Sequence, residues 1–527
     1  MQSSVAYLIQ LNKKYLEINI NTIPVKNLGA TEVIGHFINN TNIADENRPQ
    51  PITNPATGET TRYVAMASQK TVEAAIDAAQ AAFPAWRNTP PTKRARIMFK
   101  FKRLLEEHAE EISAAITEEH GKVFDDAMGE FSRGVEIVDY ACGISELLKG
   151  EYSKNVAAGI DSWSDFQPLG VIAGISPFNF PAMVPMWMYP MAIACGNTFV
   201  MKPSEKVPTA SLIVARLLKE AGLPDGVFNL VNGDKEAVDT LLSDERVQAI
   251  SFVGSTAVAE YIYATGTKHG KRVQALGGAK NHAIVMPDAD IDNAVSALIG
   301  AAYGSCGERC MAISVAVCIG DKVADSVVKK LQSEIAELKV GPGINTSNHM
   351  GPLITKAHHD KVRSYVDLGI KEGAKLIADG RDLIIEGYED GNFIGPCLFD
   401  NVTSKMRIYQ EEIFGPVLCI VRAESEEQAM QLIDDHEYGN GTCIFTRDGE
   451  AARYFADNIQ VGMVGINVPL PVPASYHSFG GWKRSLFGDL FIYGPDSIRF
   501  YTRRKTITQR WPTGGIREKA QFAFPSN

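Results

Sequence analysis

Two cysteines, Cys306 and Cys310, lie four residues apart in the segment GSCGERCMAIS at residues 304–314. A cysteine in such a segment can be a nucleophile, a metal ligand, half of a disulfide or a small buried residue, and burial is the commonest of these. A nucleophile also needs a donor for the charge that develops on the substrate. Asn179 is a candidate donor, because SPFNFP (176–181) fixes it between two prolines; an asparagine that caps the loop is the alternative.

Three further segments have residue types that suit a cofactor, although each also has an ordinary interpretation. FVGSTAVAE (252–260) follows a strand pattern and opens a helix pattern, which is the context of a phosphate-binding turn, but Gly254 is its only glycine. MKPSE (201–205) sets a lysine at a strand end, where a surface lysine is equally common. EEIFGPV (411–417) begins with two carboxylates, which surface pairs also do. None of these segments identifies a function alone.

The composition indicates a globular protein of several domains that acts on a small molecule. The chain has 527 residues, of which 45% are hydrophobic and 22% charged. A formal charge of −10 opposes binding to nucleic acid or to anionic lipid, so neither is an expected partner. Eight dispersed cysteines without a CxxC pair indicate a reducing compartment, interpreted as the cytoplasm, and no metal site is predicted.

Neither the start of the chain nor its longest uncharged stretch resembles a targeting or membrane segment. Residues 1–20 lack the pattern of a secretory signal and are interpreted as a disordered extension or an upstream start. Residues 166–201 carry no charged side chain, but five prolines interrupt them, and no helix of about 20 residues fits between the prolines. This stretch is therefore predicted to be a buried interior.

The rest of the chain alternates between strand and helix patterns. From residue 170, apolar runs such as GVIAGIS, NTFVMKP and VQAISFVG are separated by amphipathic helices such as PTASLIVARLLKEAG, which predicts a parallel doubly wound sheet. Residues 92–122 are predicted to form a long amphipathic helix or a pair of helices on this sheet. A second alternation after residue 282 predicts a second α/β lobe. Residues 497–511 alternate like an edge strand, which favours oligomerisation.

Taken together and in this order, the segments resemble the aldehyde dehydrogenase superfamily, from ITNPATGE near residue 50 to FGGWKRS at 479–485. The chain is most similar to the CoA-acylating methylmalonate-semialdehyde dehydrogenase branch, through GERCMA, GAKNH, PFNFPAMVPMWMYPMAIACGN and SIRFYTRRK. The resemblance implies an NAD-binding domain, a catalytic lobe, a small β arm, and a homodimer or homotetramer. The implied ranges are 21–150 and 170–282 for the NAD-binding domain, 283–478 for the catalytic domain, 151–169 and 490–511 for the arm, and 512–527 for a tail.

The same resemblance assigns roles to individual residues. Cys310 is implied to be the nucleophile and Asn179 the oxyanion donor, while Arg133 and Arg309 bind the substrate carboxylate. The residues implied to bind NAD are Ser176, Phe178, Lys202, Glu205, Gly233, Gly254, Ser255, Glu412 and Phe414. The alternative for Arg133 is an ion pair with Glu130 on its own helix, and for Arg309 an ion pair with Glu308 or another carboxylate.

Leu276 occupies the position at which hydrolytic members of the family have a general-base glutamate, if VQALGGAKNH (273–282) is aligned without gaps. Water, with a pKa of about 15.7, needs such a base to attack a thioester. A thiol with a pKa of about 8.5 depends on it far less, so coenzyme A is the expected acceptor. The prediction is that methylmalonate or malonate semialdehyde is oxidised with NAD and CoA to propionyl-CoA or acetyl-CoA and CO2. A hydrolytic semialdehyde dehydrogenase and a non-catalytic protein of the same fold are the alternatives.

Overall fold

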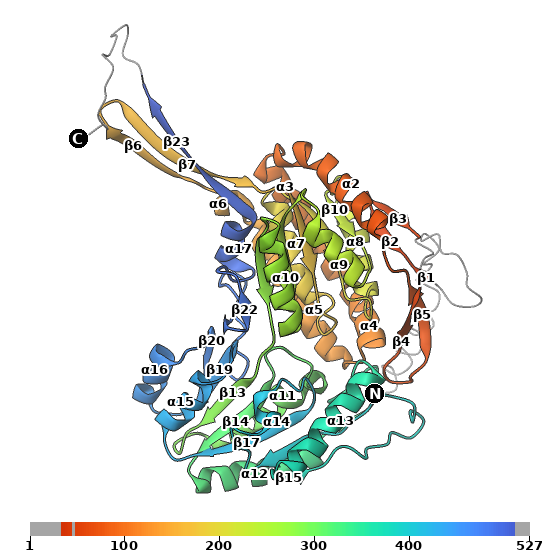
Figure 1. The fold of residues 1–527 in the computed structure, drawn as a ribbon, viewed down its shortest axis with the longest axis vertical. Coiled ribbons are helices and arrows are strands. Elements are labelled where there is room, and N and C mark those ends of the chain that lie inside the picture. The colour runs from red at the N-terminus through yellow and green to blue at the C-terminus, as the bar shows by residue number, and fades with distance from the viewer. Residues whose placement is uncertain (1–32, 45–47, 512–527) are drawn as a thin grey trace.

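The computed structural model describes residues 33–44 and 48–511, and Figure 1 shows two α/β lobes and a projecting arm. The extension predicted at 1–20 and the tail at 512–527 lie outside the described residues. The predicted doubly wound fold with a second α/β lobe is confirmed. Smaller elements accompany the lobes: β1 (Val33–Ile34), β4 (Gln50–Thr53), β5 (Thr60–Val64), α6 (Ile144–Leu147), β18 (Tyr438–Gly439) and β21 (Trp482–Lys483).

The first lobe is built on an eight-stranded sheet that contains five consecutive parallel strands, β12 to β10 in spatial order. The spatial order is β22 (Leu486–Phe487), β12 (Arg272–Leu276), β11 (Val247–Val253), β8 (Val171–Ile175), β9 (Thr198–Lys202), β10 (Phe228–Leu230), β2 (His36–Ile38) and β3 (Thr41–Ile43). Strands β8, β9 and β10 follow one another toward one edge of the sheet, whereas β11 and β12 are added on the other side of β8. The order of the strands therefore reverses between β8 and β11. In open α/β sheets, ligands bind outside the carboxyl ends of the strands at such a point.

Helices cover both faces of this sheet (Figure 1). One face carries α2 (Gln69–Arg87), α9 (Lys235–Ser243) and α10 (Thr256–Lys268); the other carries α3 (Pro91–Glu107), α4 (Ala109–His120), α5 (Phe124–Cys142), α7 (Met183–Ala194) and α8 (Thr209–Glu220). Alternate residues of β8 supply the two cores. Val171 and Ala173 pack with the first group of helices and Ile172 with the second, as the period of a strand requires.

Two predictions about uncharged or long helical segments are resolved by these helices. The segment 92–122 forms a pair of helices, because the helical conformation is interrupted at His108, between α3 and α4. The uncharged stretch 166–201 contains β8, β9 and a helix, α7, of only 12 residues, all of them buried. The prediction of a buried interior is therefore confirmed.

The second lobe is built on a seven-stranded sheet in which every neighbouring pair is parallel except β15 and β16. Its order is β15 (Lys375–Ala378), β16 (Cys397–Asp400), β17 (Val417–Ala423), β14 (Ile313–Ile319), β13 (Asn281–Val285), β19 (Gly441–Phe445) and β20 (Met463–Ile466). The helices of this lobe are α11 (Ile291–Tyr303), α12 (Asp321–Ala336), α13 (Lys356–Lys371), α14 (Arg407–Gln410), α15 (Glu426–Asp434) and α16 (Gly449–Asn458). Four residues separate the end of β12 from the start of β13, so the chain enters the second lobe through a short turn.

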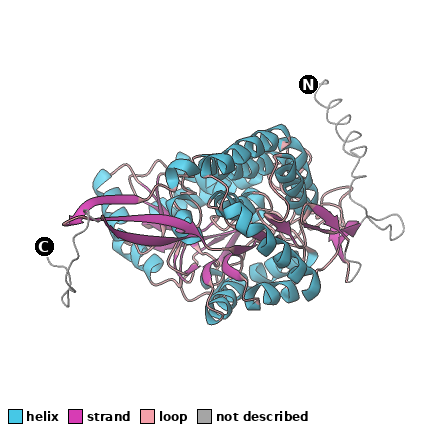
Figure 2. Ribbon diagram, turned by 90° about the horizontal axis from the view of Figure 1, so that it is seen from above, coloured by secondary structure: helices cyan, strands magenta, loops and turns pink. Residues whose placement is uncertain are grey.

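The arm is a three-stranded antiparallel sheet that extends beyond the helices of the body when seen from above (Figure 2). Its order is β23 (Thr502–Arg510), β7 (Ile160–Pro168) and β6 (Glu151–Ala157). The strand predicted over 497–511 is shorter than expected, because Gly494–Tyr501 forms helix α17. Pro495 opens that helix and Ile498, Phe500 and Tyr501 are buried, so packing overrides the alternating pattern.

Candidate active site

The segment after β8 carries Asn179 and is anchored to the other lobe. Asn179 is 3% exposed, and its Nδ2 atom donates a hydrogen bond of 2.9 Å to the carbonyl oxygen of Glu308. The partner lies 129 residues further along the chain, so the side chain does not cap its own loop. Because Glu308 precedes Cys310 by two residues, the structure places the predicted oxyanion donor beside the loop of the predicted nucleophile.

A buried ion pair is hydrogen-bonded to the segment that carries Asn179. The Nζ atom of Lys122 lies 2.7 Å from Oε2 of Glu130, both side chains are fully buried, and Lys122 also donates to the Asn179 carbonyl at 2.7 Å. The second oxygen of Glu130 accepts from the N–H groups of Ala182 and Met183. A buried charge is tolerated only when it is paired and hydrogen-bonded, as here.

Cys310 follows the tight turn η1 (Gly304–Gly307), in which Ser305, Cys306 and Gly307 all have a positive φ. Gly307 has a φ of +72°, and a Cβ atom there would lie 2.2 Å from the carbonyl oxygen of Gly415. Cys306 is 1% exposed within this turn. All eight cysteines are free thiols and seven are buried, while Cys310 is half-buried. Of the two cysteines in the segment, Cys306 is thus the core residue.

The Cys310 thiol lies in a pocket whose other lining residues include Asn281, Arg309, Glu412 and Phe414. Burial and then the charge of Glu412 raise the pKa of the thiol to about 12, while hydrogen bonds from the backbone N–H groups of Cys310 and Met311, and the charge of Arg309, oppose the rise. The thiol is therefore protonated at neutral pH, and its deprotonation depends on these donors.

Glu412 lies against the turn that joins the two lobes. Its Oε1 atom accepts from the N–H group of Ala279 at 2.9 Å. A Cβ atom on Gly278 would lie 2.5 Å from Oε2, so glycine at that position allows the approach. Burial raises the pKa of the Glu412 carboxyl group, and the Ala279 hydrogen bond and nearby lysines oppose this rise. The carboxyl group and the Cys310 thiol thus share one pocket.

Two predicted aromatic residues meet across the lobes. The rings of Phe178 and Phe414 are 6.0 Å apart in an edge-to-face arrangement. The ring of His120 stacks on Phe178 at 5.9 Å, and the Lys206 ammonium group lies 5.3 Å from the same ring. The Nε2 atom of His358 donates to the carbonyl oxygen of Phe414 at 2.7 Å. The structure therefore brings these two predicted residues together although 235 positions separate them.

Lys202, Glu205 and Ser176 lie at the carboxyl ends of β8 and β9. The Lys202 ammonium group lies 3.3 Å from Glu205. Burial raises the pKa of Glu205, but attraction to Lys202 and further hydrogen bonds outweigh it, and the net shift is downward. Ser176 donates its N–H to the Lys202 carbonyl, and its buried Oγ atom has no hydrogen-bond partner among the described residues. A charged pair beside a buried unpaired hydroxyl is a site fit for a polar ligand.

Gly233, Gly254 and Ser255 lie at the ends of the neighbouring strands. Gly233 follows β10, and a Cβ atom there would lie 2.6 Å from Cβ of Ala237. Gly254 donates its N–H to the carbonyl oxygen of Leu276 at 3.1 Å, and Ser255 is the N-cap of α10 without using its side chain as a cap. The structure thus leaves the Ser255 hydroxyl and the first N–H groups of α10 beside the switch point, where dinucleotide phosphates bind in such sheets.

Leu276 is the last residue of β12 and is 3% exposed. It packs in the same apolar cluster as Cys310. No carboxylate is available at this position, whose side chain is apolar.

Arg133 lies on α5, is not among the residues that line the Cys310 pocket, and shares the carbonyl oxygen of Pro473 with Tyr493. Its guanidinium group pairs with Glu136 at 2.6 Å and donates to the carbonyl oxygen of Pro473 at 2.8 Å. The hydroxyl of Tyr493 donates to the same carbonyl at 3.0 Å, and the charges of Arg133 and Cys310 both act on the pKa of Tyr493, which burial raises. Arg133 therefore forms an ion pair on its own helix, as the alternative expected, but with Glu136; the expected partner, Glu130, pairs with Lys122 instead.

Arg309 precedes the nucleophile candidate and is also paired. One of its guanidinium nitrogens lies 2.6 Å from Asp126 on α5. Glu308, the other predicted partner, points away into a buried region where its Oε1 atom accepts from the N–H of Ile354 at 3.3 Å. The structure therefore shows an ion pair with a carboxylate other than Glu308.

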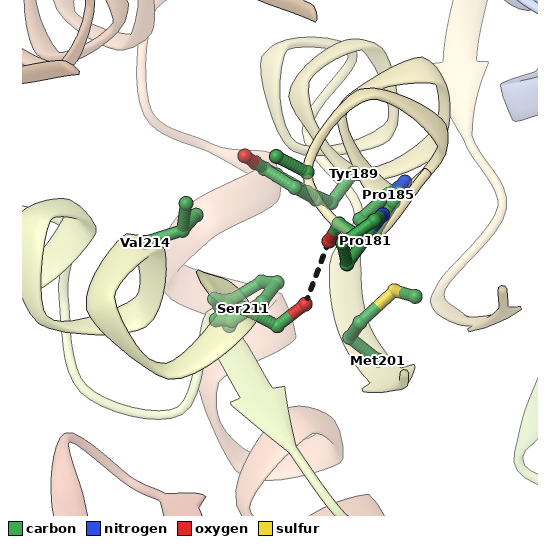
Figure 3. A pocket seen from close by; sticks show the side chains of 8 residues that line it. Pro181, Pro185, Tyr189, Met201, Ser211 and Val214 are labelled. Carbon is green, nitrogen blue, oxygen red and sulfur yellow. Dashed lines mark hydrogen bonds between the residues drawn. The ribbon is translucent and has the colours of Figure 1, made fainter. Parts of the chain in front are cut away.

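A second pocket lies behind the Asn179 segment, between α7, α8 and β9 (Figure 3). Its lining residues are Pro181, Ala182, Pro185, Tyr189, Met201, Ser211, Val214 and Phe228. Figure 3 shows the Ser211 hydroxyl donating to the carbonyl oxygen of Pro181, a hydrogen bond of 3.3 Å. None of the predicted site residues lines this pocket. The Ser211 hydrogen bond holds Pro181, two residues after Asn179.

Sequence reasoning assigned no role in the site to Lys122, Glu130 or Tyr493. Lys122 lies in the loop between α4 and α5, Glu130 lies on α5 and Tyr493 precedes α17, so their places in the sequence do not link them to Asn179 or Cys310. In the described ranges, no group of three or more His, Cys, Asp or Glu side chains is arranged to hold a metal ion. No helix within residues 33–44 and 48–511 is long and apolar enough to span a membrane.

Comparisons with known proteins agree with this geometry. The aldehyde dehydrogenase family model matches residues 43–507. Malonate-semialdehyde dehydrogenase of Pseudomonas aeruginosa is 66% identical over 491 residues, which are 93% of this chain and 99% of the relative. The Halalkalibacterium halodurans enzyme of the same name is 47% identical over 486 residues, covering 92% and 100%.

Two solved structures are similar to most of the chain. The crystal structure of methylmalonate-semialdehyde dehydrogenase from Oceanimonas doudoroffii has a TM-score of 0.91 and 65% identity, covering 92% of this chain and 100% of that one. The putative methylmalonate-semialdehyde dehydrogenase from Sinorhizobium meliloti, complexed with NAD, has a TM-score of 0.91 and 53% identity, covering 92% and 99%.

Proposed function

Because the chain belongs to the aldehyde dehydrogenase family, we propose that it oxidises malonate semialdehyde, methylmalonate semialdehyde or both, with NAD and coenzyme A, to an acyl-CoA and CO2. The observation that carries the proposal is the buried Asn179 amide, which is hydrogen-bonded to the loop of Cys310. The names of relatives at 66% and 65% identity support the substrate class. An amide and a thiol held in this way are the parts that acyl transfer through a thioester requires.

In the proposed reaction, the Cys310 sulfur forms a bond to the aldehyde carbon, the thiol proton passes to water, and the electron pair of the C=O π bond moves onto the aldehyde oxygen. The N–H of Asn179 that does not bond to Glu308 and the backbone N–H of Cys310 stabilise the charge on the former carbonyl oxygen. NAD held by the residues named next would supply the hydride acceptor, and loss of the hydride from this carbon would leave a thioester on Cys310. The residues proposed to hold NAD are Ser176, Phe178, Lys202, Glu205, Gly233, Gly254, Ser255, Glu412 and Phe414.

The substrate carboxylate is proposed to bind Arg133 and Arg309. A planar guanidinium group binds a carboxylate through two hydrogen bonds, which fixes the aldehyde relative to Cys310. In the thioester this carboxylate lies β to the thioester carbonyl. The C–C bond to the carboxylate therefore breaks with release of CO2, and the carbon that retains the electron pair takes up a proton.

Release of the acyl group is proposed to go to coenzyme A rather than to water. At the position of a water-activating glutamate, Leu276 offers only a buried apolar side chain. The thiol of coenzyme A then attacks the thioester carbonyl and the Cys310 sulfur leaves. A hydrolytic enzyme would need a base from another position.

The arm is proposed to join chains into a homodimer or homotetramer. Strand β23 is the edge of its sheet, and Tyr152 on β6 and Trp511 beyond β23 are exposed to 61% and 52%. Exposed edges and large apolar side chains favour pairing with another chain. The mass of the protein in solution, compared with that of a variant lacking residues 502–511, measures this directly.

The test of the proposed function supplies each semialdehyde with NAD, with and without coenzyme A, and follows NADH absorbance and the acyl product by mass spectrometry. The expected result is NADH with propionyl-CoA or acetyl-CoA. Free carboxylic acid formed at an equal rate without coenzyme A would instead make the chain hydrolytic. The absence of NADH with any aldehyde would make it a non-catalytic member of the fold.

A further inference from the structure

Two buried asparagines hold the carbonyl oxygen of Cys310. The Nδ2 atom of Asn281 donates to it at 2.9 Å, and the Nδ2 atom of Asn440 donates to it at 3.2 Å. Asn281 is 2% exposed and Asn440 is 6% exposed. A carbonyl oxygen has two lone pairs, so protein donors fill both. Neither asparagine belongs to the site predicted from the sequence.

The two asparagines are parts of one network at the start of adjacent strands. Asn281 begins β13, and its Oδ1 atom accepts from the N–H of Gly441, the first residue of β19, at 3.1 Å. Its Nδ2 atom also donates to the carbonyl oxygen of Ala312 at 3.0 Å. Asn440 lies next to Gly441 and contacts the sulfur of Met311 at 3.1 Å. The two asparagine side chains therefore contact all three residues of the segment 310–312.

The same peptide unit also carries a donor that lowers the pKa of the thiol. The carbonyl group of Cys310 and the N–H group of Met311 belong to one peptide bond. The pKa of the thiol is raised by burial and by Glu412, and the N–H groups of Cys310 and Met311 oppose this rise. A peptide whose carbonyl accepts hydrogen bonds becomes a stronger donor at its N–H, because hydrogen bonds in a chain polarise one another.

We propose that Asn281 and Asn440 are positioning residues, which polarise the Cys310–Met311 peptide and keep its N–H aimed at the Cys310 sulfur. The inference rests on the proposed function only in that Cys310 is the nucleophile. The attacking sulfur carries negative charge, so the stronger donor stabilises it and favours attack. The titratable or charged groups that otherwise face the thiol are Glu412, Arg309 and Tyr493.

The test measures the rate of Cys310 alkylation by iodoacetamide between pH 6 and pH 10, in the full chain without substrate, NAD or coenzyme A. The variants are Asn281→Ala and Asn440→Ala, and alkylation is assigned to the Cys310 peptide by mass spectrometry. Thr442→Val is the matched control, because its hydroxyl donates to the His282 carbonyl between the same two strands without touching Cys310. Thermal unfolding of each variant is recorded in parallel.

Each asparagine variant is expected to shift the pH–rate profile upward by about half a pH unit, which lowers the alkylation rate on the rising limb by about threefold. Thr442→Val is expected to lose stability while its pH–rate profile stays in place. Unshifted profiles in the asparagine variants, or an equal shift in Thr442→Val, would overturn the inference. If Asn281→Ala does not fold, Asn440→Ala alone decides between these outcomes. Because alkylation needs no semialdehyde turnover, the result stands apart from success or failure of the proposed function.

Discussion

Replacement of Arg133 by leucine tests how the substrate carboxylate is recognised. The Arg133 guanidinium group contacts Glu136 and the carbonyl oxygens of Pro473 and Val472. If it also binds the substrate, the variant loses a charge-assisted hydrogen bond of about 1.5–3 kcal/mol. At about 1.4 kcal/mol for each factor of ten, kcat/KM for the semialdehyde should fall by about 10- to 150-fold.

The assay compares the semialdehyde with propionaldehyde, which has the aldehyde group but no carboxylate. Arg133→Leu is expected to leave kcat/KM for propionaldehyde nearly unchanged, so the preference for the semialdehyde collapses. Glu136→Gln is the control, because it breaks the ion pair on α5 but keeps the arginine. An exposed pair at this spacing contributes about 0.2–0.5 kcal/mol, so the control should change either rate by no more than about twofold.

An equal fall for both aldehydes in Arg133→Leu would refute the reasoning. In that case the loss would come from the segment around Pro473, which the guanidinium group and Tyr493 both hold. The carboxylate-binding role would then be dropped.

Three further outcomes are expected. Cys310→Ala should abolish NADH formation while Cys306→Ala keeps most of it, and equal loss in both variants would contradict the assignment of the nucleophile. Lys122→Met should lower the free energy of unfolding by about 3–5 kcal/mol, as the loss of one member of a buried pair does, and the double variant with Glu130→Gln should recover much of this, as chemical denaturation would show. For Asp126, burial raises the pKa but neighbouring cations outweigh it and hold the folded-state value below 3.8. Its stabilising effect is therefore full above pH 3.8 and lost as the pH falls through the folded-state pKa, so the difference in Tm between wild type and Asp126→Asn should shrink from pH 6 to pH 3.

The parallel strands of both sheets were predictable because their sequence signal is local. Gly170 precedes the apolar run 171–175 and Gly320 follows the run 313–319, and both runs become fully or nearly fully buried strands. The helix at Gly494–Tyr501 was not predictable from alternation, since its buried residues are selected by tertiary packing. The arm strand that follows keeps its alternating pattern because packing there is limited to one neighbouring strand.

The site residues also differ in whether their own sequence segment makes them predictable. Cys310 and Asn179 carry a chemical signal in their own short segments, the one four residues from a second cysteine and the other between prolines. The buried partner of a site residue carries no such signal. Asn281 and Asn440 reach one carbonyl oxygen from positions 159 residues apart, and only the fold brings them together.

The central claim is that Cys310 carries an acyl group which coenzyme A removes. The most direct measurement mixes the protein with semialdehyde and NAD, without coenzyme A, and determines the intact mass and the modified peptide. The account predicts one acyl group for each chain, on the Cys310 peptide, with a matching burst of NADH, slow loss in water and rapid loss when coenzyme A is added. An acyl group on another residue, no acyl group despite NADH formation, or loss at the same rate with and without coenzyme A would contradict it.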